Sequence, residues 1–286
     1  MAGTGGQRED REHLWDGVRA ICSSPAHLPS VVGFPLLFAA VIVAVSGVSA
    51  GSLVGVLAET LFVFGVVLAL FGPRLAADAF AARYAAARQL RWEVEGDLPF
   101  GTWLLDRNRD ATAPHSLMSG ALSGGPEGIV CFFEVARSPG VLRAIRAPLT
   151  VAVYDISAAR GVDGLVCTPR ASDGKRGRLP SRVRRVELDD EQFSALYEIG
   201  VRGESDAPLA EQIFAPDFRA WMAGVAEGSD MACALSFELS EGTLCVSVPG
   251  RRTTTSSLDD FVGRSVRIAS KVSDLDAFVA EAAQEA

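Results

Sequence analysis

One long apolar run constrains this chain more than any other feature of its sequence. From Val31 to Pro73 the only ionisable side chain is that of Glu59. The run is roughly twice as long as the 20 or so apolar residues that cross a bilayer once. It therefore predicts two transmembrane helices, at about residues 31–50 and 53–71, joined by a tight turn because lipid excludes open loops. A cleaved signal peptide is disfavoured, because the run is too long and the segment before it carries four acidic residues.

Arginines on either side of the run predict the orientation of the two helices. Three precede the first predicted span and four follow the second, whereas the turn between the spans has none. Because Lys and Arg accumulate on the cytoplasmic side, we expect both termini in the cytoplasm and a multi-pass location in the cell (plasma) membrane. Residues 1–30 then form a cytoplasmic segment with a short amphipathic helix. Residues 74–95, which begin rich in Ala and Arg, form a helical stalk.

Two features inside the run have a structural and a functional interpretation. Gly47, Gly51 and Gly55 recur every four residues, which either lets helices associate closely or merely builds the turn between the spans. Glu59 is a functional candidate because a carboxylate inside a membrane is costly. Alternatively it reaches the headgroups from near the interface. Neither span offers it a basic partner, which disfavours a transport pathway.

The composition excludes several classes of protein. Of the 286 residues, 49% are hydrophobic even with Gly left out, which is more than an ordinary soluble chain contains. The formal net charge of -8 disfavours nucleic acid as a partner, because such binding relies on Lys and Arg that neutralise phosphates. The five cysteines include no C-x-x-C pair and predict small buried hydrophobic side chains rather than disulfides or a zinc site. They are Cys22, Cys131, Cys167, Cys233 and Cys245.

After about residue 96 the sequence changes to short β-favouring runs separated by Gly, Pro, Asp and Ser. The expected strands are His115–Leu122, Gly128–Ala136, Pro148–Ile156, Gly164–Thr168, Ser181–Leu188, Tyr197–Val201, Met231–Leu239 and Gly242–Val248, with a hairpin turn at Glu241 and Gly242. The expected helices are Ala207–Phe214, Asp217–Ala226 and Leu275–Ala283. Closely spaced strands with few helices between them predict an antiparallel sheet. We therefore expect residues 96–286 to form an α+β domain with a bent or barrel-like sheet and late helices, of which a pleckstrin-homology-like barrel is one version.

Several segments of this region recur in the same order in a known group of proteins. They are a small-residue strand at 119–124, an aromatic strand at 131–134, a strand at 149–153, the segment 186–193, and the helix start Ala215-Pro216-Asp217-Phe218. Over about residues 101–271 the chain thereby resembles a family of uncharacterised membrane-anchored bacterial proteins, in which a transmembrane hairpin precedes a cytoplasmic α+β domain of unknown function. The resemblance implies a tethered domain with no established activity and carries over no catalytic residue.

Motifs for catalysis or cofactor binding are missing from the sequence. Of the three histidines only His115 lies in the expected domain, where it stands alone and is interpreted as a strand residue or a polar contact in a loop. No phosphate-binding glycine motif occurs, since Gly174 and Lys175 are followed by Arg rather than Ser or Thr. The adjacent acids of residues 189–191 would point to different sides of the chain and predict a turn and helix cap instead of a metal site. We therefore expect no enzyme, no cofactor and no metal.

A cluster of basic residues is the strongest candidate site in the expected domain. It consists of Lys175, Arg176, Arg178, Arg182, Arg184 and Arg185. At a cytoplasmic membrane face such a cluster binds anionic headgroups. It can also be a solvated loop and strand edge, where Arg prevents unwanted strand pairing. Nucleic acid is a third and weaker interpretation, because no aromatic side chains are interleaved with the cluster.

The expected function follows from the predicted anchor and the missing chemistry. We expect a two-pass membrane protein whose cytoplasmic domain is an interaction or scaffold module for a protein or an anionic membrane surface. The alternative is a subunit of a membrane enzyme or transporter whose site is completed by a partner chain, with Glu59 or the basic cluster contributing. The expected partners are the lipid bilayer, an unknown protein and a second copy of the chain, but not nucleic acid.

Overall fold

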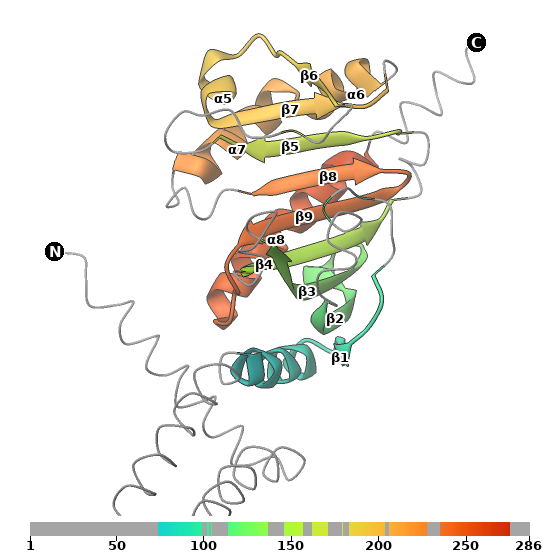
Figure 1. Cartoon of the computed structure of the whole chain (residues 1–286), viewed down its shortest axis with the longest axis vertical. Coiled ribbons are helices and arrows are strands. Elements are labelled where there is room, and N and C mark those ends of the chain that lie inside the picture. Colours follow the sequence, from blue (N-terminus) through green and yellow to red (C-terminus); the bar gives the residue numbers. More distant parts are fainter. Residues whose placement is uncertain are drawn as a thin grey trace, which may run out of the picture. The chain divides into compact units, whose positions relative to one another are not determined.

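The structure is a computed structural model, and a nine-stranded antiparallel sheet dominates the part that it describes (Figure 1). It describes residues 74–98, 102, 104, 114–136, 146–156, 162–170, 179, 183–203, 206–227 and 235–274. The chain divides into two compact units, Met1–Arg83 and Tyr84–Ala286, and the sheet belongs to the second. In their order across the sheet, the strands are β1 (Arg91–Glu95), β2 (His115–Ala121), β3 (Glu127–Ala136), β4 (Arg146–Asp155), β9 (Thr243–Pro249), β8 (Ser236–Ser240), β5 (Leu165–Pro169), β7 (Tyr197–Val201) and β6 (Arg184–Val186).

The hairpin of β8 and β9 lies inside the sheet rather than at its edge. Strand β9 pairs with β4, from Leu149 opposite Pro249 to Asp155 opposite Thr243. Strand β8 pairs with β5 on the other side of the hairpin. The two strands are joined at Glu241 and Gly242, whose φ angles of 50° and 85° suit the tight turn of a two-residue hairpin and confirm the predicted turn.

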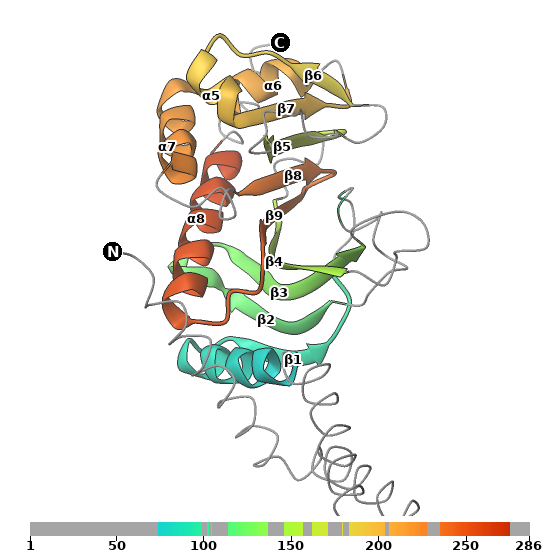
Figure 2. The same cartoon turned by 60° about the vertical axis from the view of Figure 1, so that its left-hand side comes forward.

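One face of the sheet is covered by helices that follow the strands in sequence. They are α5 (Glu191–Leu196), α6 (Asp206–Ile213), α7 (Pro216–Glu227) and α8 (Thr255–Ser273), and Figure 2 shows α7 and α8 along this face. Helix α8 begins where the Thr254 side chain accepts a hydrogen bond from the backbone N–H of Ser257 at 3.2 Å. Its buried residues recur at helical spacing and pack on the strands, where Ser265 and Tyr154 share a hydrogen bond of 2.6 Å.

A further helix ends directly before β1. It is described from residue 74 and runs to residue 87. Gln89 then takes a positive φ of 58°, and the N–H of Leu90 donates to the carbonyl of Ala85 at 2.9 Å. A left-handed residue followed by this backward bond is a common way to end a helix. The chain can therefore turn at once into the extended strand β1.

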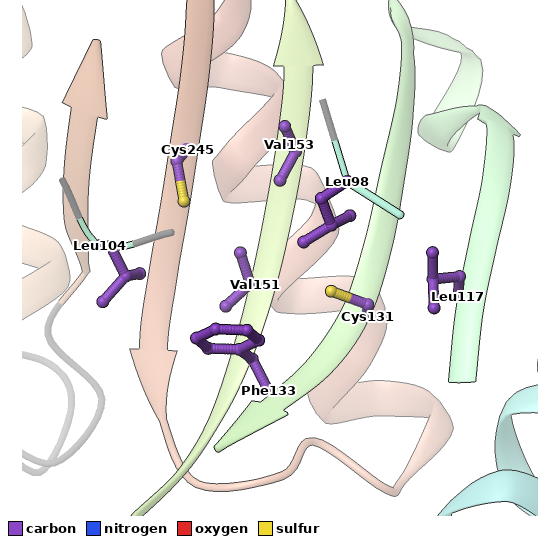
Figure 3. Packing of buried hydrophobic residues seen from close by; sticks show 8 residues of the cluster. All are labelled: Leu98, Leu104, Leu117, Cys131, Phe133, Val151, Val153 and Cys245. Carbon is purple, nitrogen blue, oxygen red and sulfur yellow. The ribbon is translucent and has the colours of Figure 1, made fainter. Parts of the chain in front are cut away.

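The other face of the sheet carries an apolar cluster around two free thiols (Figure 3). Its buried members are Leu98, Leu104, Leu117, Cys131, Phe133, Val151, Val153 and Cys245. Burial raises the pKa of the Cys131 thiol to about 12 and the pKa of Cys245 well above its ordinary value. Together with Cys167, these thiols confirm the prediction of small buried hydrophobic residues, whereas Cys22 and Cys233 lie outside the described residues.

The predicted fold class is wrong in its overall architecture, although many of its elements are present. Each of the eight predicted strands overlaps an observed strand, and the helices predicted at 207–214 and 217–226 are α6 and α7. The sheet is not a closed barrel, because β1 and β6 end it and do not pair with each other. Strand β1 and helix α8 were not predicted, and the helix predicted at 275–283 lies outside the described residues.

The transmembrane hairpin and the location derived from it are also corrected. Among the residues that the structure describes, none of the helices combines the length and apolar composition that a membrane crossing requires. This finding contradicts the predicted hairpin and the multi-pass location in the cell membrane. The predicted spans themselves, at 31–50 and 53–71, lie outside the described residues. Where a helical stalk was expected to reach residue 95, the structure has a helix to residue 87 and then strand β1.

Candidate functional site

Only two residues of the predicted sites fall within the described part of the chain. Arg184 and Arg185 lie in β6, the short strand that ends the sheet. The other predicted residues lie outside the described part: Lys175, Arg176, Arg178 and Arg182 of the basic cluster, Gly47, Gly51 and Gly55 of the glycine series, and Glu59. The described part of the basic cluster is therefore its last two residues, Arg184 and Arg185.

Arg185 is held by a buried acid rather than exposed to solvent on all sides. It forms a close ion pair with Glu198 of the neighbouring strand β7. The side chain of Glu198 is 0% exposed, whereas that of Arg185 is 30% exposed. A carboxylate removed from water is costly unless a cation compensates it. We conclude that Arg185 has a structural role, which the sequence analysis did not foresee.

A cavity of about 220 Å³ lies beside this ion pair at the β6 edge of the sheet. Its wall includes Arg170, whose Nε donates a hydrogen bond of 3.4 Å to the carbonyl of Tyr197. The remaining lining residues are Arg185, Val186, Glu187, Leu188, Asp189, Asp190, Glu191, Phe193, Ser194, Tyr197, Glu198 and Ile199. Charged groups of both signs line the cavity. They include the Arg185–Glu198 ion pair and acidic residues at the start of helix α5.

Asp190, one of the acidic residues that line the cavity, stabilises the fold. Asp190 caps helix α5 by accepting a hydrogen bond from the backbone N–H of Phe193 at 2.9 Å. Its other carboxylate oxygen lies 3.5 Å from Arg219 of helix α7. This arrangement confirms the predicted turn and helix cap at residues 189–191. Among the described residues, no group of three acidic, His or Cys side chains is placed to hold a metal ion.

His115 is a buried residue of β2, as the sequence analysis predicted. Its ring packs against Phe132 with 5.9 Å between ring centroids, and its Nδ1 lies 3.4 Å from the hydroxyl of Ser116. His115 and Ser116 are both buried, at 2% and 0% exposure, so this pair lies inside the packed sheet. His115 therefore belongs to the packing of the sheet.

Strand β1 at the opposite edge of the sheet has a different character. Among the described residues it pairs with β2 on one side only, and its sequence Arg-Trp-Glu-Val-Glu is largely exposed. Trp92 is 37% exposed and Val94 is 48% exposed, and these are the exposed large hydrophobic residues of the described part of the chain. Because side chains alternate along a strand, both lie on the same face. Arg91 and Glu93 lie on the other face and form an exposed ion pair of 2.7 Å.

The sequence contained a signal for this surface that the helical interpretation concealed. Polar and apolar residues alternate from Arg91 to Glu95, which is the period of a strand with two distinct faces. The Ala-rich stretch before it has high helix propensity, and extending that helix too far assigned Trp92 to a stalk. For Glu198 the signal was a single charged residue within an otherwise apolar strand.

Comparisons of the chain with protein-family models, with curated proteins and with solved structures found no match. The resemblance to a family of membrane-anchored bacterial proteins therefore stays a prediction. Among the described residues, the exposed large hydrophobic side chains both lie on β1.

Proposed function

We propose that residues 84–274 form a protein-binding module that uses the β1 edge of its sheet. An extended segment of the partner protein binds beside β1 and adds one strand to the sheet. The observation that supports the proposal is the pair of exposed hydrophobic residues, Trp92 and Val94, on a strand that has a neighbour on only one side in the described part of the chain. This proposal keeps the interaction module that the sequence predicts.

When a strand is added to a sheet edge, backbone groups and side chains contribute differently to binding. The backbone N–H and C=O groups on the outer side of an edge strand are available to a further strand. Hydrogen bonds between backbones provide affinity, and the side chains provide the selection of the partner. Trp is among the residues most often found to dominate binding energy at protein interfaces. Trp92 is therefore the residue of β1 that we expect to contribute most.

The opposite edge of the sheet is less suited to this function. Strand β6 has three residues, and two of them are Arg184 and Arg185. Short edges with like charges resist the addition of another strand. Arg185 is in addition engaged by Glu198. The two edges thus differ in length, charge and apolar exposure, and all three differences favour β1.

Photo-crosslinking in the cells that produce the protein tests the proposal. A photoreactive phenylalanine analogue replaces Trp92 in the full-length chain, and a matched variant carries it at Glu211, an exposed position of helix α6. We expect adducts at position 92 that map, by mass spectrometry, to one segment of one protein, and no such adducts at position 211. Adducts that scatter over many proteins, or that are equal at the two positions, would show that β1 is not a binding site.

A further inference from the structure

We infer that the segment that pairs with β1 is β1 of a second copy of the chain. The inference rests on the proposed function, since it names the partner of the same edge. It follows from the order of residues in β1 and the residue before it, Leu-Arg-Trp-Glu-Val. When this order is read against itself in the antiparallel direction with Trp92 opposite Trp92, each position meets a suitable side chain.

On the apolar face, this register brings hydrophobic side chains together at three places. The two Trp92 rings lie opposite each other on the twofold axis, and Leu90 of each copy faces Val94 of the other. Leu90 precedes Trp92 by two residues and therefore lies on the same face. Its side chain lies beside β2, since a Cβ added at Gly120 would be 3.1 Å from it. Aromatic and aliphatic pairs directly opposite each other stabilise antiparallel strands. The pairing covers Trp92 and Val94, the exposed hydrophobic residues of the edge.

On the polar face, the same register pairs opposite charges. Arg91 of each copy lies opposite Glu93 of the other, so the interface contains two such pairs related by symmetry. Within one copy these two side chains already lie 2.7 Å apart, and both are exposed at 78% and 41%. An exposed pair of this kind is weak and can exchange partners at little cost. The charges of β1 therefore permit self-pairing, whereas the two arginines of β6 would meet like charges.

The resulting dimer has closed symmetry. Closed symmetry prevents strand pairing from continuing into an open-ended polymer. A twofold axis through Trp92 uses the β1 edge of each copy once. The edge that remains on either side is β6, which is short and positively charged. The assembly therefore ends at two copies.

Charge exchange tests the partner directly. Dimerisation of the purified full-length chain is measured by sedimentation velocity over a range of concentrations. Arg91→Glu alone and Glu93→Arg alone each create two like-charged pairs, and we expect each to weaken dimerisation about tenfold. Mixed together, the two variants regain complementary charges in the heterodimer and should associate as tightly as the unsubstituted chain. Glu211→Arg, the same charge reversal at a remote exposed position, should change nothing.

Cysteine trapping tests the register. In a background with Cys22→Ser and Cys233→Ser, Trp92→Cys places two thiols opposite each other, where antiparallel Cα atoms lie about 4.5–5.5 Å apart and a disulfide can form. In the same register, two cysteines introduced by Val94→Cys are about 14 Å apart along the strands and cannot be bridged. We expect an oxidised dimer for Trp92→Cys and none for Val94→Cys. Equal trapping of both variants would reject the register.

The two kinds of failure are distinguishable. If the purified chain stays monomeric, or if the charge-exchanged mixture is no tighter than its components, the second copy is not the partner. Adducts at position 92 with a segment of another protein would then leave the proposed function standing and reject only the inference. If position 92 also gives no specific adducts in cells, the proposed function fails as well.

Discussion

Removing the cation from the buried ion pair of Arg185 and Glu198 should destabilise the sheet more than removing the anion. In Arg185→Met the fully buried carboxylate of Glu198 loses its compensating charge. Breaking a buried ion pair from one side costs about 3–5 kcal/mol. Because water reaches part of the Arg185 side chain, we expect a loss at the lower end, about 3 kcal/mol in the free energy of unfolding.

The reverse substitution is expected to be milder. In Glu198→Gln an uncharged amide replaces the carboxylate, and the partly exposed guanidinium of Arg185 can turn toward solvent. We expect a loss of about 1 kcal/mol. Replacing both residues by Met removes both charges from the interior and should bring the stability back to within about 1 kcal/mol of the unsubstituted chain.

Urea denaturation followed by far-ultraviolet circular dichroism measures all four proteins under the same conditions. The deficit of Arg185→Met should also depend on pH, because its uncompensated carboxyl group binds a proton more readily in the folded than in the unfolded state. Unfolded Glu titrates near pH 4.3, so the deficit should be larger at pH 8 than at pH 5. Equal losses for the two single variants, or a larger loss for Glu198→Gln, would refute the reasoning.

Three further predictions concern packing, capping and the buried thiols. Gly128→Ala should cost about 1–3 kcal/mol of stability in urea, because an added Cβ would lie 2.7 Å from the ring of Tyr154. The control Gly224→Ala, in helix α7 with nothing within 4 Å of the added Cβ, should stabilise by up to about 1 kcal/mol. Thr254→Ala should cost about 1 kcal/mol and lower the melting temperature, because it removes the cap of helix α8. Cys131, whose pKa is about 12, should resist iodoacetamide at pH 8.5 until the chain is unfolded, and rapid labelling of the native protein would contradict its burial. Because the unfolded thiol ionises near pH 8.5, replacing Cys131 by Ala should reduce the loss of stability between pH 8.5 and 10.

Local patterns predicted most of the strands, but they did not predict where the strands lie in the sheet. The run Tyr197–Val201 was recognised with its exact bounds, because β-favouring residues between turn residues are a local signal. The insertion of β8 and β9 between β4 and β5 depends on which edges are available after folding. Helix α8 was missed although Thr254 supplies a cap, because the Ser and Thr residues around it favour a loop.

The candidate site was predicted even less completely, for a related reason. Residue types identified a basic cluster, but the neutralisation of Arg185 depends on the register that places β6 beside β7. The exposed edge at Trp92 depends on where a helix ends, and Gln89 adopts the left-handed conformation that usually requires Gly. Both features result from tertiary structure and from a single unusual backbone angle, which composition and periodicity do not encode.

The central position of the last hairpin has a consequence for how the chain is made. When the ribosome has completed β4 and β5, each strand presents an edge whose neighbour has not yet been synthesised. Both edges find their partners only when residues 236–249 emerge. Until then, strands β1 to β4 and strands β5 to β7 form two separate parts of the sheet. Such long-range pairing slows folding and leaves unpaired strand edges exposed, where other chains can associate. A chain interrupted before residue 236 would release two half-sheets, and aggregation during synthesis should be most acute at that stage.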